Sequence, residues 1–146
     1  MRKYLPLMDI KTYPVDIDIL LTPVGEPLCK ITVGDQQRDI KILQQCHIKL
    51  KVQGLGPLQL AIEHHSKRDL DPTTALIIEE IKFDTITSPR FVWEGIYRPN
   101  YPKHMTGASE LKYHNYLGWN GVWSLDFTLP IYTWIHKIED LGWIYD

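Results

Sequence analysis

Apolar and polar residues alternate along most of the chain, which is the pattern of β-strands that bury one face. The clearest case is 46–52, where four apolar side chains alternate with His47, Lys49 and Lys51. The sequence Gly-Leu-Gly-Pro that follows predicts a hairpin turn into the next strand. The same alternation predicts further strands at 15–21, 29–33, 38–43, 58–62, 75–86, 91–97 and 122–129.

One segment has the spacing of a helix. Apolar residues recur every three or four positions over 131–141. Thr128 is the predicted N-cap, Pro130 suits the first turn and Gly142 suits the C-terminal stop. These features predict one short C-terminal helix at 130–141.

Short strands, many Gly and Pro turns and one terminal helix predict a single domain over residues 1–146. Its fold class is all-β, an antiparallel β-sandwich with a jelly-roll-like arrangement. The segment 98–120 has no clear periodicity and contains two prolines and two glycines. A loop of this length in a compact domain is usually functional, so we expect it to carry the interaction site.

Aromatic residues are concentrated near the C-terminus. Of the 16 aromatics (5 Trp, 8 Tyr and 3 Phe), 13 follow residue 90. Strand and helix spacing place Trp123, Phe127 and Trp134 in the core. The remaining cluster is the candidate binding site: Tyr97, Tyr101, Tyr113, Tyr116 and Trp119, with the amide of Asn120 beside it. Such residues stack on sugar rings, form hot spots of protein interfaces, or cover an open end of a sandwich, and all three interpretations stay open.

Charge and cysteine content exclude several classes of protein. The net charge of −2 argues against nucleic-acid binding through a basic face. No apolar run is long enough for a membrane span, and the first residues lack the apolar region of a secretory signal. Cys29 and Cys46 have no metal-type spacing, so we expect two reduced thiols and folding in a cytoplasm.

The sequence offers weak candidates for a metal site. His64 and His65 are adjacent on a predicted strand, so their side chains point to opposite faces and cannot chelate one ion. Asp69 and Asp71 are weak calcium candidates, because an Asx-turn before Pro72 explains them equally well. We therefore expect no cofactor.

Catalytic signals are also weak. Glu79 and Glu80 are successive residues of a predicted strand, so we expect them on opposite faces. Glu94 and Asp126 lie on different predicted strands and would support hydrolase chemistry only if they converge within the roughly 5–9.5 Å that glycosidases require. We expect a protein that is not an enzyme.

Four segments carry a resemblance to a known group of proteins. They include Tyr-Arg-Pro-Asn-Tyr-Pro at 97–102 and Leu-Gly-Trp-Asn-Gly-Val-Trp-Ser-Leu-Asp-Phe at 117–127. The chain resembles small jelly-roll proteins of large tailed phages, notably those of marine cyanobacteria, which are similar in layout to carbohydrate-binding modules. The four segments are 63–67, 73–83, 93–102 and 117–134.

The resemblance implies a virion location, with folding in the host cytoplasm. The leading expectation is a non-catalytic structural or accessory protein of the phage particle. It would dock onto other virion proteins, or onto copies of itself, through the aromatic loop and without nucleic acid or membrane. The alternative is a carbohydrate-binding module that stacks the sugars of a surface glycan on Trp119 with Tyr101, Tyr113 or Tyr116. A hydrolase that uses Glu94 and Asp126 is the third hypothesis.

Overall fold

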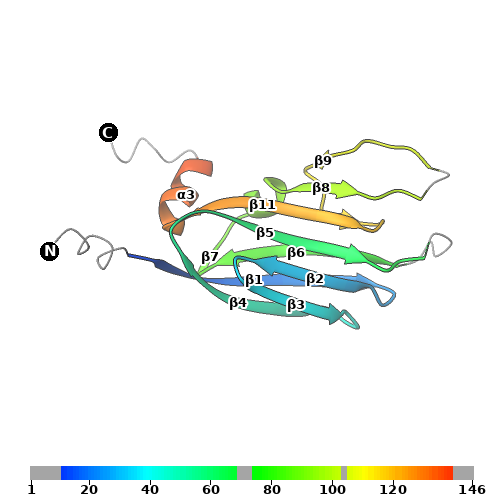
Figure 1. Cartoon of the computed structure of the whole chain (residues 1–146), viewed down its shortest axis with the longest axis horizontal. Coiled ribbons are helices and arrows are strands. Elements are labelled where there is room, and N and C mark those ends of the chain that lie inside the picture. The colour runs from blue at the N-terminus through cyan, green and yellow to red at the C-terminus, as the bar shows by residue number, and fades with distance from the viewer. Residues whose placement is uncertain (1–10, 69–73, 103–104, 140–146) are drawn as a thin grey trace, which may run out of the picture.

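The computed structural model describes residues 11–68, 74–102 and 105–139. Two antiparallel sheets face each other and α3 covers one end (Figure 1). Neither helix in these ranges is long and apolar enough to cross a membrane. The elements are β1 Tyr13–Val24, β2 Leu28–Val33, β3 Gln36–Lys41, β4 Cys46–Gly54, β5 Gly56–His65, β6 Ala75–Phe83, β7 Ile86–Thr87, α2 Arg90–Trp93, β8 Ile96–Pro99, β9 Leu111–Lys112, β10 Tyr116–Leu117, β11 Gly121–Leu129 and α3 Ile131–Ile138.

The strand order defines the two layers of the sandwich. One sheet has the order β10-β6-β1-β4, with β7 paired to β6, and the other has the order β3-β2-β5-β11-β8-β9. The alternation in the sequence produces this arrangement, because each strand turns its apolar side chains towards the facing sheet. The predicted antiparallel β-sandwich with one short terminal helix is confirmed.

The core lies between the sheets and continues under α3. Ile17 and Ile19 of β1 belong to the same buried cluster as Ile31 and Ile62 of the facing sheet. Near α3 the core is aromatic: the Phe83 ring packs edge-on against Phe91 and Trp134 and against the tilted ring of Phe127. Trp123 and Phe127 are buried, as the strand spacing predicts.

The predicted hairpin at 54–57 is wrong. β4 pairs with β1, whereas β5 pairs with β2 and β11 in the other sheet. The turn therefore carries the chain across the sandwich. Both strands have one apolar face, and a crossover lets these faces meet across the core instead of lying side by side in one sheet.

The predicted strand at 91–97 is wrong in its first half. Phe91 and Val92 are both buried, and successive residues of a strand would point to opposite faces. A single helical turn, α2, buries both, and the chain becomes a strand only at Ile96. The segment 98–120 also contains two short strands, β9 and β10, so it is less irregular than its sequence indicates.

The start of the terminal helix also differs from the prediction. Thr128 belongs to β11, and extended Pro130 occupies the N-cap position without a side-chain cap. The strand continues this far because Phe127 and Leu129 keep the alternation of buried side chains. The helix Ile131–Ile138 buries Ile131, Trp134 and Ile135 against the sandwich, as the helical spacing predicts.

Candidate functional site

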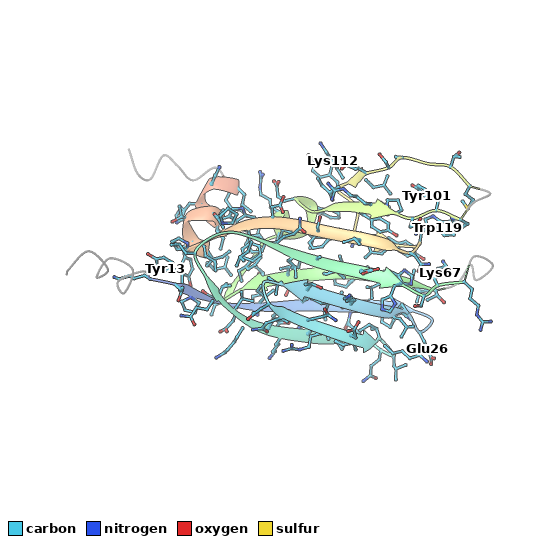
Figure 2. The ribbon with its side chains drawn as sticks, viewed as in Figure 1. Tyr13, Glu26, Lys67, Tyr101, Lys112 and Trp119 are labelled. Atoms are coloured by element: carbon cyan, nitrogen blue, oxygen red, sulfur yellow. The ribbon has the colours of Figure 1, made fainter. Side chains whose placement is uncertain are left out.

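Most of the predicted aromatic site gathers in one cavity at the end of the sandwich opposite α3. Figure 2 shows Lys67, Tyr101 and Trp119 close together there, far from Tyr13 at the other end. The cavity has a volume of about 340 Å³, and we call it the aromatic pocket. Its lining residues are Lys67, Tyr97, Tyr101, Leu111, His114, Tyr116, Gly118 and Trp119.

Trp119 is the central side chain of the aromatic pocket. The Lys67 ammonium lies 4.8 Å from the centroid of its ring, within the range of a cation–π contact. The same ammonium donates a hydrogen bond of 2.6 Å to the Gly118 carbonyl. The Tyr101 ring meets Trp119 edge-on, with 6.4 Å between ring centroids. These contacts fix the plane of the indole at the surface.

Tyr97 lies beneath the pocket and supports it. Its side chain is only 1% exposed, so the ring faces the core instead of a ligand. Its hydroxyl donates to the Trp119 carbonyl and accepts from the Trp119 N–H at 3.1 Å. The ring stacks on His114 with 5.6 Å between centroids. Burial raises the pKa of Tyr97 to about 12, so this donor remains protonated at neutral pH.

Asn120 joins the two segments that carry Lys67 and Trp119. Its side-chain carbonyl accepts from the Lys67 backbone N–H at 2.8 Å, and its side-chain amide donates to the Lys67 carbonyl at 3.0 Å. Asn120 is not part of the pocket lining. Its role in this geometry is to hold Lys67 at the correct distance from the indole.

Tyr101 is held by the loop that follows it. Its hydroxyl donates to the Ala108 carbonyl at 3.1 Å. Gly107 packs so closely that a Cβ there would lie 2.6 Å from Cζ of the Tyr101 ring. A glycine is therefore required for the ring to keep its position beside Trp119.

The two remaining predicted residues, Tyr113 and Tyr116, differ in whether they line the pocket. Tyr116 of β10 lines the pocket and is 45% exposed. Tyr113 is 74% exposed and lies outside the lining. Lys67 and His114 line the pocket but are not among the residues that the sequence predicts, and Lys67 lies about fifty positions before the tryptophan that it contacts. The only signal for it was its place in the histidine-rich segment 63–67, which no local rule links to Trp119.

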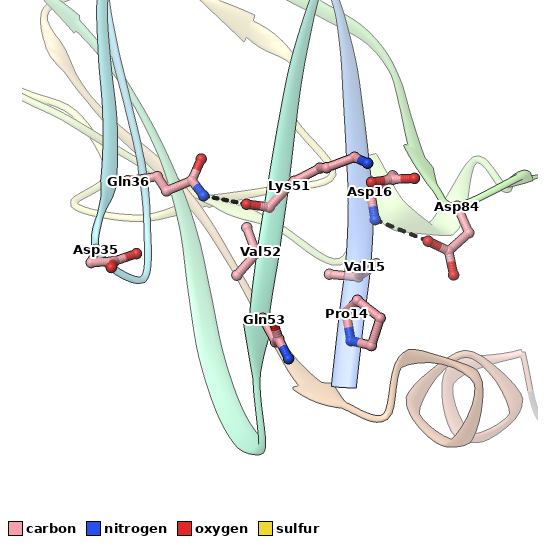
Figure 3. Close-up of a pocket in the computed structure, with 9 residues that line it drawn as sticks. All are labelled: Pro14, Val15, Asp16, Asp35, Gln36, Lys51, Val52, Gln53 and Asp84. Atoms are coloured by element: carbon pink, nitrogen blue, oxygen red, sulfur yellow. Dashed lines mark hydrogen bonds between the residues drawn. The ribbon is translucent and has the colours of Figure 1, made fainter. Parts of the chain in front are cut away.

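Two larger cavities lie elsewhere and have no aromatic lining. Figure 3 shows one of about 560 Å³, where Asp84 Oδ1 accepts from the backbone N–H of Asp16 at 2.9 Å. A neighbouring cavity of about 680 Å³ shares Asp16, Gln36, Lys51 and Asp84 with it. Both are lined mainly by charged and amide side chains, and neither lining includes an aromatic ring on which a sugar could stack.

Glu94 and Asp126 also share a cavity, of about 240 Å³. Arg98 and Ser124 line the same cavity and are joined by a hydrogen bond of 3.2 Å. Gln59 donates to Asp126 Oδ1 at 2.9 Å. Both carboxylates are exposed, whereas a glycosidase acid is held protonated by an apolar environment or a close like charge.

The calcium candidates Asp69 and Asp71 lie outside the described residues. Within 11–68, 74–102 and 105–139, no group of three or more His, Cys, Asp or Glu side chains is arranged to hold a metal ion. His64 is buried and His65 is half-exposed, so the two imidazoles do point to opposite sides of β5. Cys29 and Cys46 are both free thiols, as expected.

The β-sandwich layout is shared with carbohydrate-binding modules. No protein-family model and no curated protein matches the sequence. A solved structure of vCBM60 in complex with galactobiose is similar, with a TM-score of 0.53 and 12% identity over 75% of this chain and 96% of that chain. A selenomethionine form of vCBM60 gives a TM-score of 0.50 and 12% identity over 76% and 89%. This second vCBM60 structure was reported with a circular permutation that provides an evolutionary link between two families of calcium-dependent carbohydrate-binding modules.

Proposed function

We propose that this protein binds carbohydrate in the aromatic pocket and performs no chemistry on it. The observation that carries the proposal is the convergence of Tyr101, Tyr116 and Trp119 on one cavity of about 340 Å³. Tyr101 follows β8, Tyr116 belongs to β10, and Trp119 lies in the turn between β10 and β11. Their convergence is a property of the fold and not of local composition.

The chemistry of the pocket matches the two kinds of surface on a sugar. The C–H face of a pyranose ring packs against an aromatic face, and its hydroxyls require donors and acceptors at the edge. Trp119 supplies the flat surface, held from one side by Lys67. The imidazole of His114 and the phenol of Tyr101 supply polar atoms on the same lining. The similarity of the fold to a galactobiose-binding module supports the same class of ligand.

Calcium is implied by one of the similar structures, and the described part of this pocket does not fit it. Calcium takes six to eight oxygen ligands, several of them carboxylates. The pocket lining contains no carboxylate, and it contains the Lys67 ammonium, which repels a cation. We derive no step of sugar recognition through a metal ion.

Binding without catalysis agrees with the environment of the two candidate carboxylates. Glu94 and Asp126 are exposed, and the Arg98 guanidinium in their cavity is paired with Glu110, with 2.9 Å between Nη2 and Oε2. Docking onto a phage particle stays a prediction from the sequence, since neither the fold nor the similar structures favour it.

The test is binding of the purified protein to a carbohydrate panel by affinity electrophoresis and calorimetry. The panel contains galactobiose, cellobiose, xylobiose and chitobiose with their polymers. Trp119→Ala should weaken binding at least tenfold, a loss of about 1.4 kcal/mol, because the main stacking surface is removed. Tyr132→Ala is the matched control, since it removes an exposed aromatic from α3 at the other end of the sandwich. If Trp119→Ala binds a sugar of the panel with the same affinity as the unchanged protein, the proposed site is wrong.

A further inference from the structure

A second, smaller cavity lies at the edge of the sheet that contains β6 and β10. Its volume is about 190 Å³, and we call it the Trp93 cavity. Six of its lining residues carry an aromatic ring or a polar group: Glu79, Glu80, Thr87, Ser88, Trp93 and Asn115. None of these residues takes part in the aromatic pocket.

The single turn of α2 makes the aromatic side of the Trp93 cavity. Phe91 and Val92 are buried, which turns Trp93 outwards at the end of the helix. The indole is 39% exposed, and a tryptophan buried only for packing would lose more of its surface. The cavity therefore has the same kind of flat apolar surface as the aromatic pocket.

A β-bulge makes the polar side of the cavity. The register of β1 on β6 shifts between Leu20 and Leu21, which face Glu80 and Ile78, so Glu79 has no partner opposite it. The expected alternation of Glu79 and Glu80 is therefore wrong, and both carboxylates are exposed at the cavity. Bulges commonly re-aim side chains in this way beside binding sites.

The polar groups of the cavity are mainly hydrogen-bond acceptors. The Asn115 amide donates to the Ile78 carbonyl at 3.0 Å, which leaves its own carbonyl oxygen as an acceptor. The two carboxylates add further acceptors, and no Lys or Arg lines the cavity. Such a lining suits hydroxyl groups, which donate, and it repels carboxylated or sulfated sugars.

One short segment of chain separates the two cavities. His114 and Tyr116 line the aromatic pocket, whereas Asn115 between them lines the Trp93 cavity. The backbone carbonyl of Asn115 accepts from Ile78 N at 2.9 Å, which fixes the segment along β6. Tyr116 is 45% exposed at this boundary. The two cavities therefore lie on either side of this segment, and a ligand that fills both must pass over the exposed Tyr116 side chain.

We propose that the Trp93 cavity is a second sugar subsite and that the ligand is an uncharged oligosaccharide or polysaccharide which spans both cavities. The inference rests on the proposed function of the aromatic pocket and adds the length and charge of the ligand. Trp93 stacks on one sugar unit, Glu79 and Glu80 accept from its hydroxyls, and Tyr116 lies under the part of the chain between the subsites.

The test compares dimers and hexamers of cello-, xylo- and galacto-oligosaccharides by calorimetry. For a sugar that binds, the hexamer should bind the unchanged protein at least tenfold more tightly than the dimer. Trp93→Ala should remove most of this gain and leave the dimer affinity unchanged. Trp93→Phe should retain part of the gain, because it keeps a flat ring. Near-ultraviolet circular dichroism checks that each variant is folded.

The outcomes separate this inference from the proposed function. Equal affinity for dimer and hexamer, or a gain that Trp93→Ala leaves intact, overturns the second subsite while the aromatic pocket stands. Preferential binding of hexagalacturonate, which carries a carboxylate on every unit, also overturns it. If the unchanged protein binds none of these sugars and no member of the carbohydrate panel, the proposed function fails and the second subsite fails with it.

Discussion

At the scale of single residues, the geometry of the aromatic pocket depends on groups that hold the backbone of Trp119 and Lys67. Tyr97 is the clearest example, since its buried hydroxyl satisfies both backbone groups of Trp119. The Asn120 side chain likewise forms hydrogen bonds with both backbone groups of Lys67. Such side chains keep an exposed indole in one position, and this reduces the entropy lost when a ligand binds.

Tyr97→Phe tests this supporting role. The substitution keeps the ring and removes the hydroxyl, which leaves the Trp119 N–H and carbonyl without this partner. We expect the free energy of unfolding to fall by about 1–2 kcal/mol and carbohydrate binding to weaken severalfold. Chemical denaturation and calorimetry measure the two effects. Tyr132→Phe, which removes an exposed hydroxyl from α3, should change both far less, and equal effects in the two variants would contradict the supporting role.

His64 gives the protein a dependence of stability on pH. Its Nδ1 lies 2.9 Å from the Leu117 carbonyl, and desolvation by burial lowers its pKa below the ordinary value. The unfolded chain therefore binds a proton where the folded protein does not, so the free energy of unfolding falls as the pH drops below about 6.5. The fall ends once the pH is below the pKa of the folded state.

Denaturation of the unchanged protein and of His64→Gln at pH 7.5, 6 and 5 measures this effect. Glutamine can still donate to the Leu117 carbonyl but does not titrate. We expect a flatter pH profile for the variant over this range. Parallel profiles would show that His64 does not carry the dependence.

At the scale of elements, the strands were predictable and their pairing was not. Alternation identifies which residues face the core, as in β1 and β4, because the period of two depends only on the chain itself. Whether β5 pairs with β4 or crosses to the other sheet depends on which other strands can pair with each of them. In the structure β1 pairs with β4, whereas β2 and β11 pair with β5. Phe91 and Val92 form a helical turn for a similar reason, since only the finished core can bury both.

The site was predictable in composition and not in geometry. The aromatic cluster was visible because Tyr101, Tyr116 and Trp119 break the strand pattern. Lys67 was not visible, since its contact with Trp119 depends on how β5 and β11 pair. The sequence predicts Tyr97 as a member of the binding cluster, although in the structure it pairs with Trp123 in the sheet and shares its buried face.

The loop between β8 and β9 supplies an element-scale prediction. Gly107→Ala places a methyl group 2.6 Å from the Tyr101 ring, which must then move away from Trp119. We expect weaker carbohydrate binding with little change in the free energy of unfolding, because residue 107 is exposed and the ring can shift. Ser109→Ala in the same loop is the matched control and should bind normally. Unchanged affinity in Gly107→Ala would show that the position of Tyr101 is unimportant.

At the scale of the whole molecule, the sandwich separates stability from recognition. α3 closes one end over the aromatic core (Figure 1), and Lys67, Tyr101 and Trp119 of the pocket lie at the other end (Figure 2). The similar structures share this fold at 12% identity, so they support the fold and not the individual side chains of the pocket. The proposed function therefore rests on Trp119 and Lys67, and the fold only positions these side chains.

Calcium dependence distinguishes this pocket from a metal-assisted one. The described lining offers no carboxylate to a calcium ion and presents the Lys67 ammonium. We therefore expect equal carbohydrate affinity in EDTA and in calcium chloride. Calorimetry under both conditions measures it. Loss of binding in EDTA that calcium restores would contradict this expectation and direct attention to Asp69 and Asp71.

The most direct test of the account is a calorimetric titration of the unchanged protein, Trp119→Ala and Tyr132→Ala with the carbohydrate panel. We predict saturable binding of at least one sugar by the unchanged protein, the same affinity in Tyr132→Ala, and at least tenfold weaker binding in Trp119→Ala. Absence of binding to every sugar, or equal affinity in all three proteins, would contradict carbohydrate recognition in the aromatic pocket.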